Sequence, residues 1–193
     1  MRSSGEYQPC LRLTSSREIV NPKGRFDSVV RTRVRLATIE DLDLLVRHRR
    51  EMFAAIDKYT SQELDDADRV YRRWARTRIR CGQLAGFIVE VGPRPVASGR
   101  VWIMEVQPRP AQKGVTVGYL LSMFTEPDGR EKGHATRIVH AAMKWARGRG
   151  ISRMTLHASP FGESVYRRLG FDRTTEMLRS LGPKRGRRNK SRD

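Results

Sequence analysis

The segment that most constrains the fold is residues 115–147, in which an apolar stretch, a turn and an amphipathic stretch follow one another. Residues 115–125 are mostly apolar, as is typical of a buried strand, and Glu126-Pro127-Asp128-Gly129 interrupts them. From Gly133 onward apolar side chains recur at helical spacing, on Ile138, Val139, Ala142, Trp145 and Ala146. Backbone N–H groups at a helix N-terminus have no helical partner and readily bind anions. The sequence therefore predicts a strand, a turn and a helix with an anion site between them.

Residues 31–181 are predicted to form one α/β (α+β) domain, because strand and helix patterns fill this stretch without an internal repeat. Before residue 115 the patterns predict a strand at 32–36, helices over 38–56 and 61–79, and a hairpin of strands 86–91 and 96–104. After residue 150 they predict a short strand at 154–157, a short helix over 162–169, and a last strand from Phe171 through Met177 to Leu181. The buried stripe expected in the first helix is Leu42, Leu45, Val46, Phe53 and Ile56.

Both ends of the chain differ from this domain in composition. Residues 1–30 carry scattered Ser, Pro and Gly without a sustained period, and we expect a disordered leader there. Residues 182–193 form a basic run without apolar side chains to dock, which predicts a disordered tail. The net charge of +18 raises nucleic acid as a partner, but only seven of the 39 basic residues are lysine. That arginine excess indicates coding bias at least as much as a binding surface.

The cysteines and the hydropathy pattern exclude several classes of protein. Cys10 and Cys81 are the only cysteines and have no metal-ligand spacing, so we expect no bound metal and no disulfide framework. The N-terminal residues lack the apolar run of a secretion signal, and no window of about 20 apolar residues occurs. We therefore expect a cytoplasmic protein that does not span a membrane.

Two motifs resemble one enzyme family. A glycine-containing turn before a helix is by itself a common backbone device, and neither a P-loop nor a G-x-G-x-x-G fingerprint is present. However, Arg130-x-x-Gly133-x-Ala135, with Pro127 three residues ahead, resembles the coenzyme-A signature of the GNAT N-acetyltransferases. The run from Ser164 to Phe171 is similar to the family's Y-x-x-L-G-F ending, and Leu156-His157-Ala158-Ser159 to the strand before it. Two motifs in the right order are far more specific than either alone.

The resemblance implies a fold and a cofactor site. It implies a GNAT-like mixed, twisted, mostly antiparallel sheet flanked by helices, whose fourth and fifth strands splay so that the pantetheine arm of acetyl-CoA lies between them. Backbone groups of Met123, Phe124 and Thr125 would hold this arm. The turn and the first helical residues would hold the diphosphate through Arg130, Glu131, Lys132, Gly133, His134, Ala135 and Thr136.

The resemblance also implies a catalytic residue. Tyr166 matches the family tyrosine that hydrogen-bonds or protonates the departing sulfur, and a phenol is a donor at neutral pH. Where many relatives place a cofactor-binding asparagine, seven residues earlier, this chain has Ser159, whose hydroxyl can replace part of that contact.

The general base cannot be carried over from the family. The fourth predicted strand lacks the glutamate that a subset of relatives uses, and Glu90 and Glu105 on the hairpin are weak candidates, because strand carboxylates are usually solubilising. His157 can titrate near neutrality, but its recurrence in this strand of relatives favours a packing role.

The implied activity is an N-acyltransferase that moves an acetyl group from acetyl-CoA to a primary amine, by direct attack in a ternary complex. We expect a small-molecule amine as acceptor. Two alternatives stay open: an acceptor on a protein N-terminus or lysine, and nucleic-acid binding on an inactive GNAT scaffold. The sequence also leaves open whether the chain acts as a monomer or a homodimer.

Overall fold

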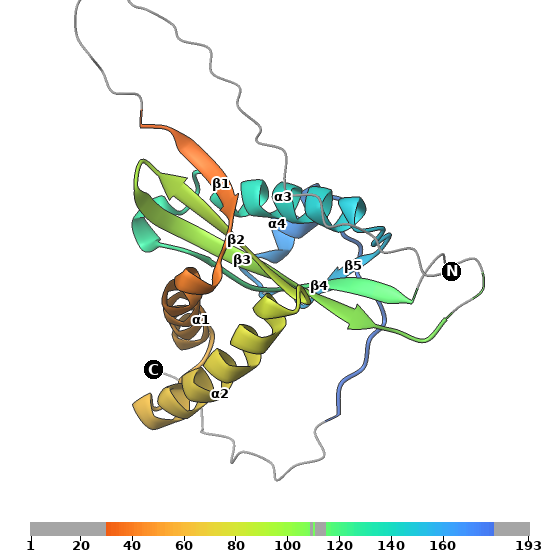
Figure 1. Ribbon diagram of the computed structural model, residues 1–193, viewed down its shortest axis with the longest axis horizontal. Coiled ribbons are helices and arrows are strands. Elements are labelled where there is room, and N and C mark those ends of the chain that lie inside the picture. The colour runs from red at the N-terminus through yellow and green to blue at the C-terminus, as the bar shows by residue number, and fades with distance from the viewer. Residues whose placement is uncertain (1–29, 109, 111–114, 180–193) are drawn as a thin grey trace, which may run out of the picture. The chain divides into compact units, whose positions relative to one another are not determined.

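The computed structural model describes residues 30–108, 110 and 115–179 (Figure 1). The described residues from Arg31 onward belong to one compact unit. The predicted leader, apart from Val30, and the predicted basic tail lie outside the described residues, so the expectation of disorder stays a prediction for both.

The centre of this unit is a five-stranded sheet whose strands follow chain order, β1-β2-β3-β4-β5. The first four strands pair antiparallel and β5 pairs parallel to β4, so the sheet is mixed, as the resemblance to the GNAT family implied. The strands are β1 (Thr32–Leu36), β2 (Leu84–Val91), β3 (Arg94–Glu105), β4 (Thr116–Thr125) and β5 (Met154–Leu156).

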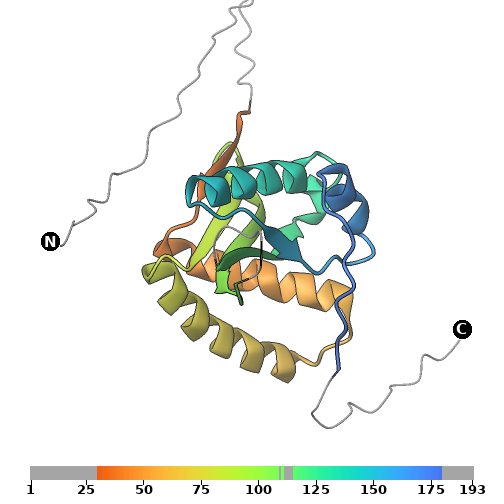
Figure 2. The same ribbon diagram turned by 90° about the vertical axis from the view of Figure 1, so that its right-hand side faces the viewer.

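Helices cover both faces of the sheet (Figure 2). Helices α1 (Leu42–Ile56) and α2 (Ser61–Arg80) lie on one face, and α3 (His134–Gly148) lies on the other. Helix α2 begins with a capping box, in which the Thr60 hydroxyl accepts from the Glu63 N–H and the Glu63 carboxylate accepts from the Thr60 N–H. Short 3-10 helices at Ile39–Asp41 and Pro127–Gly129 precede α1 and α3, and α4 is Glu163–Arg168.

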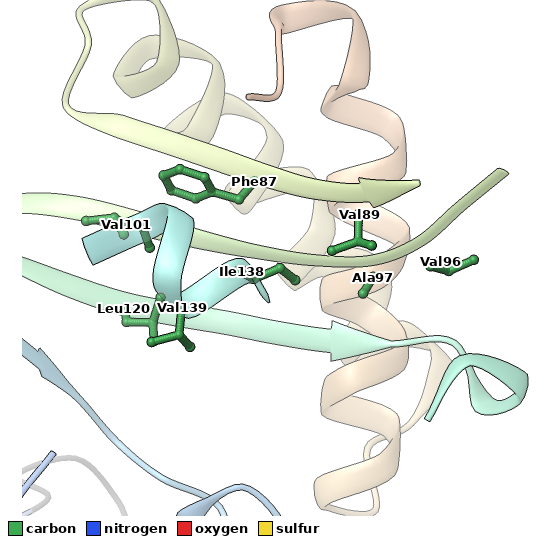
Figure 3. Close-up of a cluster of buried hydrophobic side chains, with 9 residues drawn as sticks. Phe87, Val89, Val96, Ala97, Val101, Leu120, Ile138 and Val139 are labelled. Atoms are coloured by element: carbon green, nitrogen blue, oxygen red, sulfur yellow. The ribbon is translucent and has the colours of Figure 1, made fainter. Parts of the chain in front are cut away.

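The hydrophobic core has a different character on each face. On the α3 face, nine buried apolar residues from β2, β3, β4 and α3 form one cluster (Figure 3), namely Phe87, Val89, Val96, Ala97, Val101, Leu120, Ile138, Val139 and Ala142. On the other face a smaller cluster joins Leu42, Val46, Tyr71, Ala75 and Leu84. Alternation along the strands separates the two sets, because successive side chains point to opposite faces.

Two predictions about this unit were wrong. The last strand expected from Phe171 to Leu181 is absent over residues 171–179, and Leu181 lies outside the described part. Met177 and Leu178 are exposed, so this segment lacks the buried apolar side chains of a core strand. The first helix buries His48 and leaves Ile56 more than half exposed, so its buried stripe ends earlier than expected.

Candidate active site

One edge of β4 becomes free halfway along the strand. Its parallel pairing with β5 covers three positions and ends at Leu120, which is opposite Leu156. The predicted pantetheine-binding residues Met123, Phe124 and Thr125 lie beyond this point, and β3 still pairs with the opposite edge at Phe124 and Thr125. Within the described residues, no strand pairs with the β5-facing edge here, so backbone groups on it can meet an extended ligand.

A β-bulge shapes the start of this free edge. Between the pairs Ser98–Phe124 and Arg100–Leu121, the single residue Gly99 faces both Ser122 and Met123. Ser122 has a left-handed backbone (φ 51°), and a side chain at Gly99 would collide with the sulfur of Met123. The bulge therefore redirects the backbone of β4 just before the residues expected to contact pantetheine.

A buried arginine supports the bulge. Arg100 has no exposed surface, and its guanidinium donates to the carbonyl of Ser122 at 2.7 Å and to the carbonyl of Leu45 in α1. Burial lowers the pKa of Arg100, and no described carboxylate forms an ion pair with it. The sequence analysis missed this residue, because an arginine in a strand normally marks a solvent-facing position.

The turn after β4 presents positive charge and unpaired N–H groups. Arg130, Lys132 and Glu131 are exposed, and the backbone is left-handed at Glu131 (φ 64°) and Gly133 (φ 75°). The first hydrogen bond of α3 runs from the N–H of Arg137 to the carbonyl of Gly133, and no side chain caps the helix. The preceding amides of His134, Ala135 and Thr136 therefore have no partner inside the helix, which makes this helix start suited to an anion.

The side chain of His134 plays a different role from its N–H group. It is 5% exposed, its ring lies beside Gly129, and its Nδ1 atom has no hydrogen-bond partner among the described residues. Burial, with the charges of Arg137 and Lys132, lowers the pKa of His134, so the ring is neutral at pH 7. Only the backbone of His134 is placed to contact a ligand at the loop.

Tyr166 and Ser159 lie close together near the end of β5. A Cβ atom built on Gly162 would be 3.1 Å from a ring carbon of Tyr166 and 3.5 Å from the Ser159 hydroxyl. The Tyr166 ring packs against the α3-side core and meets Phe171 edge to face at 6.0 Å. Burial raises the pKa of Tyr166 to about 12, so its hydroxyl stays protonated at neutral pH.

A buried polar cluster lies behind the end of β4. The His48 ring stacks at an angle on Phe124, its Nδ1 is 2.8 Å from the Ser98 hydroxyl, and its Nε2 is 3.1 Å from Arg47. The same Nε2 atom also lies 3.3 Å from a carboxylate oxygen of Glu126. Burial, and then the charges of Arg47 and Arg100, lower the pKa of His48 to about 4 against the opposing effect of Glu126. The ring is therefore neutral and anchors α1 to β3 and to the strand end.

A pocket of about 400 Å³ opens on the α1/α2 face of the sheet, where β3, β4 and β5 meet the segment after α4. Its apolar walls are Trp102, Met104, Val106 and Val117. Its polar groups are Tyr119, Arg153, Thr155, His157 and Glu176. Trp102 and Tyr119 are direct cross-strand partners, and Tyr119 is also the partner of Thr155. The volume is in the range of small-molecule sites.

The three residues that the sequence offered as candidate general bases have different surroundings in the structure. Glu90 lies 5% exposed at the distant β1–β2 edge, where burial acts to raise its pKa but hydrogen bonds from Arg35 and Arg33 lower it overall. That carboxylate is engaged in ion pairs and is not free to accept a proton from an amine. Glu105 is exposed at the end of β3. His157 does not have the expected packing role: its side chain is 67% exposed, and it forms a hydrogen bond with Tyr119.

Comparisons with known proteins agree with this geometry. The Acetyltransferase (GNAT) family model matches residues 46–171, which is more than half of the chain. The chain belongs to the GNAT family of acetyltransferases. A GCN5-related N-acetyltransferase from Ralstonia eutropha is 30% identical, with a TM-score of 0.73, over 78% of this chain and 98% of that one. An acetyltransferase structure from Clostridium acetobutylicum, determined with acetyl-CoA, is 26% identical, with a TM-score of 0.70, over 78% of this chain and 96% of that one.

A curated relative matches this chain over only part of its own length. An uncharacterized N-acetyltransferase of Methanocaldococcus jannaschii is 29% identical over an alignment of 145 positions that covers 72% of this chain. The match spans about 60% of the length of that relative.

Within the described residues, no cluster of His, Cys, Asp and Glu has the arrangement of a metal site, and no helix is long and apolar enough to cross a bilayer. Cys81 is exposed and away from the motifs, and Cys10 is outside the described part.

Proposed function

We propose that this protein transfers an acetyl group from acetyl-CoA to the primary amine of a small molecule, by direct attack within a ternary complex. The observation that carries the proposal is the continuity of one edge. The β5-facing edge of β4 is free after Leu120, and it leads into the positively charged turn at Arg130–Gly133 and the unpaired amides of α3. A long ligand with an amide-bearing arm and a diphosphate matches this order of features. The similarity to the Clostridium acetobutylicum structure with acetyl-CoA supports the same ligand.

Each site residue has a role in this scheme. Backbone groups of Met123, Phe124 and Thr125 pair with the pantetheine arm, and a backbone N–H of this edge stabilises the developing oxyanion. The amides from Glu131 to Thr136 and the charge of Lys132 hold the diphosphate, and Ser159 contributes a hydroxyl beside Tyr166. Tyr166 donates its proton to the sulfur as the carbon–sulfur bond breaks. No covalent enzyme intermediate is required.

The pocket next to the strand opening favours a small acceptor over a folded protein. An open pocket of about 400 Å³ with four apolar residues in its lining has room for a small molecule, and a peptide could insert only a terminus or one side chain. A screen of small amines, peptides and oligonucleotides for release of the coenzyme-A thiol separates the possibilities. Turnover of peptides alone would move the acceptor to a protein. Absence of turnover, together with oligonucleotide binding that weakens steeply with salt, would indicate a nucleic-acid-binding protein on an inactive scaffold.

The diphosphate site can be tested with a matched pair of glycines. Gly133 and Gly150 lie at the two ends of α3, both have left-handed backbones (φ 75° and 72°), and a Cβ on either meets nothing within 4 Å. Aspartate tolerates this backbone and is also a good N-cap residue, so both Gly133→Asp and Gly150→Asp should fold. We expect the parent to bind about one acetyl-CoA per chain in calorimetry. Gly133→Asp should weaken binding at least tenfold by repelling the diphosphate, and Gly150→Asp should bind like the parent.

Two outcomes would contradict this assignment. Equal affinities in both variants and the parent would place the diphosphate elsewhere. No heat of binding and no rise in melting temperature with the parent would refute the proposed function itself, because a ligand that binds only the folded state must stabilise it.

A further inference from the structure

The pocket on the α1/α2 face holds a chain of three titratable groups, Tyr119, His157 and Glu176. The Tyr119 hydroxyl is 2.5 Å from Nδ1 of His157, and Nε2 of His157 is 3.6 Å from a carboxylate oxygen of Glu176. The three residues come from β4, from the loop directly after β5, and from the segment after α4. Figure 2 shows that this segment runs past the end of β5, which explains how Glu176 reaches His157.

Contacts around α4 hold this segment in place. Arg173 forms two hydrogen bonds of 2.7 Å with the carboxylate of Glu163 in α4, and Phe171 packs on Tyr166. Glu176 follows three residues after Arg173 and is therefore directed toward the pocket by an anchored chain. The same segment contacts Tyr166 at one end and His157 at the other.

The position of Tyr119 relative to the strand opening is the second observation. Tyr119 pairs with Thr155, and the next pair, Leu120 with Leu156, is the last before the edge of β4 becomes free. The polar end of the pocket at Tyr119 is therefore two residues before Leu121, where the edge that would hold the pantetheine arm begins. Trp102, Met104, Val106 and Val117 wall the rest of the pocket, so a ligand with an apolar body would place its polar end toward Tyr119.

We propose that this pocket binds a primary amine with an apolar body, and that Tyr119 and His157 form a relay that removes the proton of its ammonium group. This inference rests on the proposed acetyl transfer. Tyr119 is the group that contacts the amine, and His157 accepts the proton through Tyr119. Glu176 is a positioning residue: it faces the Nε2 proton of His157 and stabilises the imidazolium that forms.

The hydrogen-bond roles fit this direction of transfer. A tyrosine hydroxyl that donates to Nδ1 leaves the imidazole proton on Nε2, facing Glu176. Burial, and next the charge of Glu176, raise the pKa of Tyr119, so the phenol is neutral at rest and passes a proton on as it receives one. Because the His157 side chain is 67% exposed, the proton can leave to solvent. Arg153 is the other charged group of the pocket, and its positive charge favours the neutral amine over the ammonium form once the substrate is bound.

The protons of the complete reaction balance. The ammonium gives one proton to the oxygen of Tyr119 while Tyr119 gives its own to Nδ1 of His157, and the neutral amine attacks the thioester carbon. The carbon–sulfur bond then breaks and the thiolate takes the proton of Tyr166. The second proton lost by the nitrogen restores Tyr166 through water. The products are the amide, coenzyme A and one proton, which leaves through His157.

Two isosteric acceptors test the relay. The amine of 2-phenylethylamine is an ammonium at pH 7, whereas O-benzylhydroxylamine has nearly the same shape and is neutral. We expect Tyr119→Phe and His157→Gln to lower kcat/KM for 2-phenylethylamine about 10²-fold or more, the size typical of lost acid–base catalysis. The same variants should change kcat/KM for O-benzylhydroxylamine less than about threefold, because this acceptor needs no prior deprotonation.

Two further variants serve as references. His140→Gln removes a histidine that is exposed on α3 and outside the pocket, and it should behave like the parent with both acceptors. Tyr166→Phe should slow both acceptors alike, since it acts on the sulfur and not on the amine. Melting temperatures of all variants confirm that each is folded.

Every other outcome overturns a defined part of the proposal. Equal losses with both acceptors in Tyr119→Phe or His157→Gln would make these residues part of the pocket wall and not a relay, and no loss would remove them from the reaction. If the parent binds acetyl-CoA but acetylates neither acceptor, the apolar-amine class is wrong while the proposed acetyl transfer stands. If the parent does not bind acetyl-CoA, the proposed function fails first.

Discussion

The two faces of the sheet are built on different principles. The α3 face buries only apolar side chains in its central cluster, including Ile138 and Val139 with no exposed surface. The α1/α2 face buries three polar groups completely, namely His48, Ser98 and Arg100. A buried charge costs free energy unless it is paired as well as hydrogen-bonded, and Arg100 has no described carboxylate partner, so its place on this face points to a requirement beyond stability.

The contacts of these buried polar groups show what that requirement is. Arg100 holds the carbonyl of Ser122 in the bulge, and His48 packs on Phe124 and bonds to Ser98. Each of them fixes the half of β4 that has a free edge. The α3 face therefore supplies most of the apolar burial, and the opposite face positions the backbone that is expected to hold the acetyl donor. Variants on the two faces should separate these contributions.

The largest effect on stability is expected on the α3 face. Ile138 is fully buried among apolar side chains, and Ile138→Ala leaves a cavity that its neighbours cannot close completely. We expect the free energy of unfolding, measured by chemical denaturation, to fall by about 2–5 kcal/mol. The folded fraction should bind acetyl-CoA with nearly the parent affinity. A loss of affinity without a loss of stability would contradict the division between the faces.

The sequence predicted the apolar face much better than the polar one. In α3, four of the five expected residues, Ile138, Val139, Ala142 and Ala146, are buried and the fifth, Trp145, is partly buried, because a helical apolar stripe directly encodes burial. The stripe in α1 missed His48, since a histidine between arginines looks like a solvent-facing residue. Arg100 was missed for the same reason. Its role depends on a bulge that only the pairing of β3 with β4 reveals.

The candidate site divides in a similar way. The diphosphate turn and Tyr166 belong to short motifs, so the sequence could propose them as site residues, and the structure places Ser159 close to Tyr166. The pocket could not be predicted, because Tyr119, His157 and Glu176 lie in three separate segments. Glu176 was missed because residues 171–181 were expected to form a strand, and a residue in that strand would have been assigned a place in the sheet and not in a pocket.

The pH dependence of stability tests the second face. In the folded chain the pKa of His48 is about 4, below its ordinary value of 6.5. Between these two values the unfolded chain binds a proton that the folded chain does not, so the free energy of unfolding falls as the pH is lowered from 6.5 toward 4. Below about 4 both states are protonated and this contribution stops changing. The slope attributable to His48 is at most about 1.4 kcal/mol per pH unit.

His48→Gln can keep hydrogen bonds to Ser98 and Arg47 but cannot titrate, so we expect a smaller loss of stability over this pH range. His134 also has a lowered pKa and will leave part of the slope in the variant. His140→Gln removes an exposed histidine and should retain the full parent slope. If the free energy of unfolding depended on pH identically in the parent and in His48→Gln, the pKa of His48 would not be lowered by folding.

The smallest effect, and the sharpest distinction between the faces, is expected for Arg100→Met. The substitution removes two donors, to Ser122 and Leu45, but it also removes a buried charge that has no described carboxylate partner. Replacing a buried charge by a well-packed apolar side chain is often nearly neutral for stability, so we expect the free energy of unfolding to stay within about 1.5 kcal/mol of the parent. The bulge loses its donor at Ser122, and the backbone of Met123, Phe124 and Thr125 is then less firmly held.

Calorimetry should therefore show acetyl-CoA affinity reduced about tenfold in Arg100→Met, equivalent to roughly 1.4 kcal/mol and comparable to one hydrogen bond to a charged group. Arg100→Lys keeps the charge but has a single compact donor group, which cannot reproduce the two-pronged contact with Ser122 and Leu45. It should be less stable than Arg100→Met and bind acetyl-CoA no better than the parent. If Arg100→Met unfolds the protein while the affinity of its folded fraction is unchanged, Arg100 serves stability alone. The polar residues on the α1/α2 face would then stabilise the fold, as the apolar residues on the α3 face do, and would not position the backbone for acetyl-CoA.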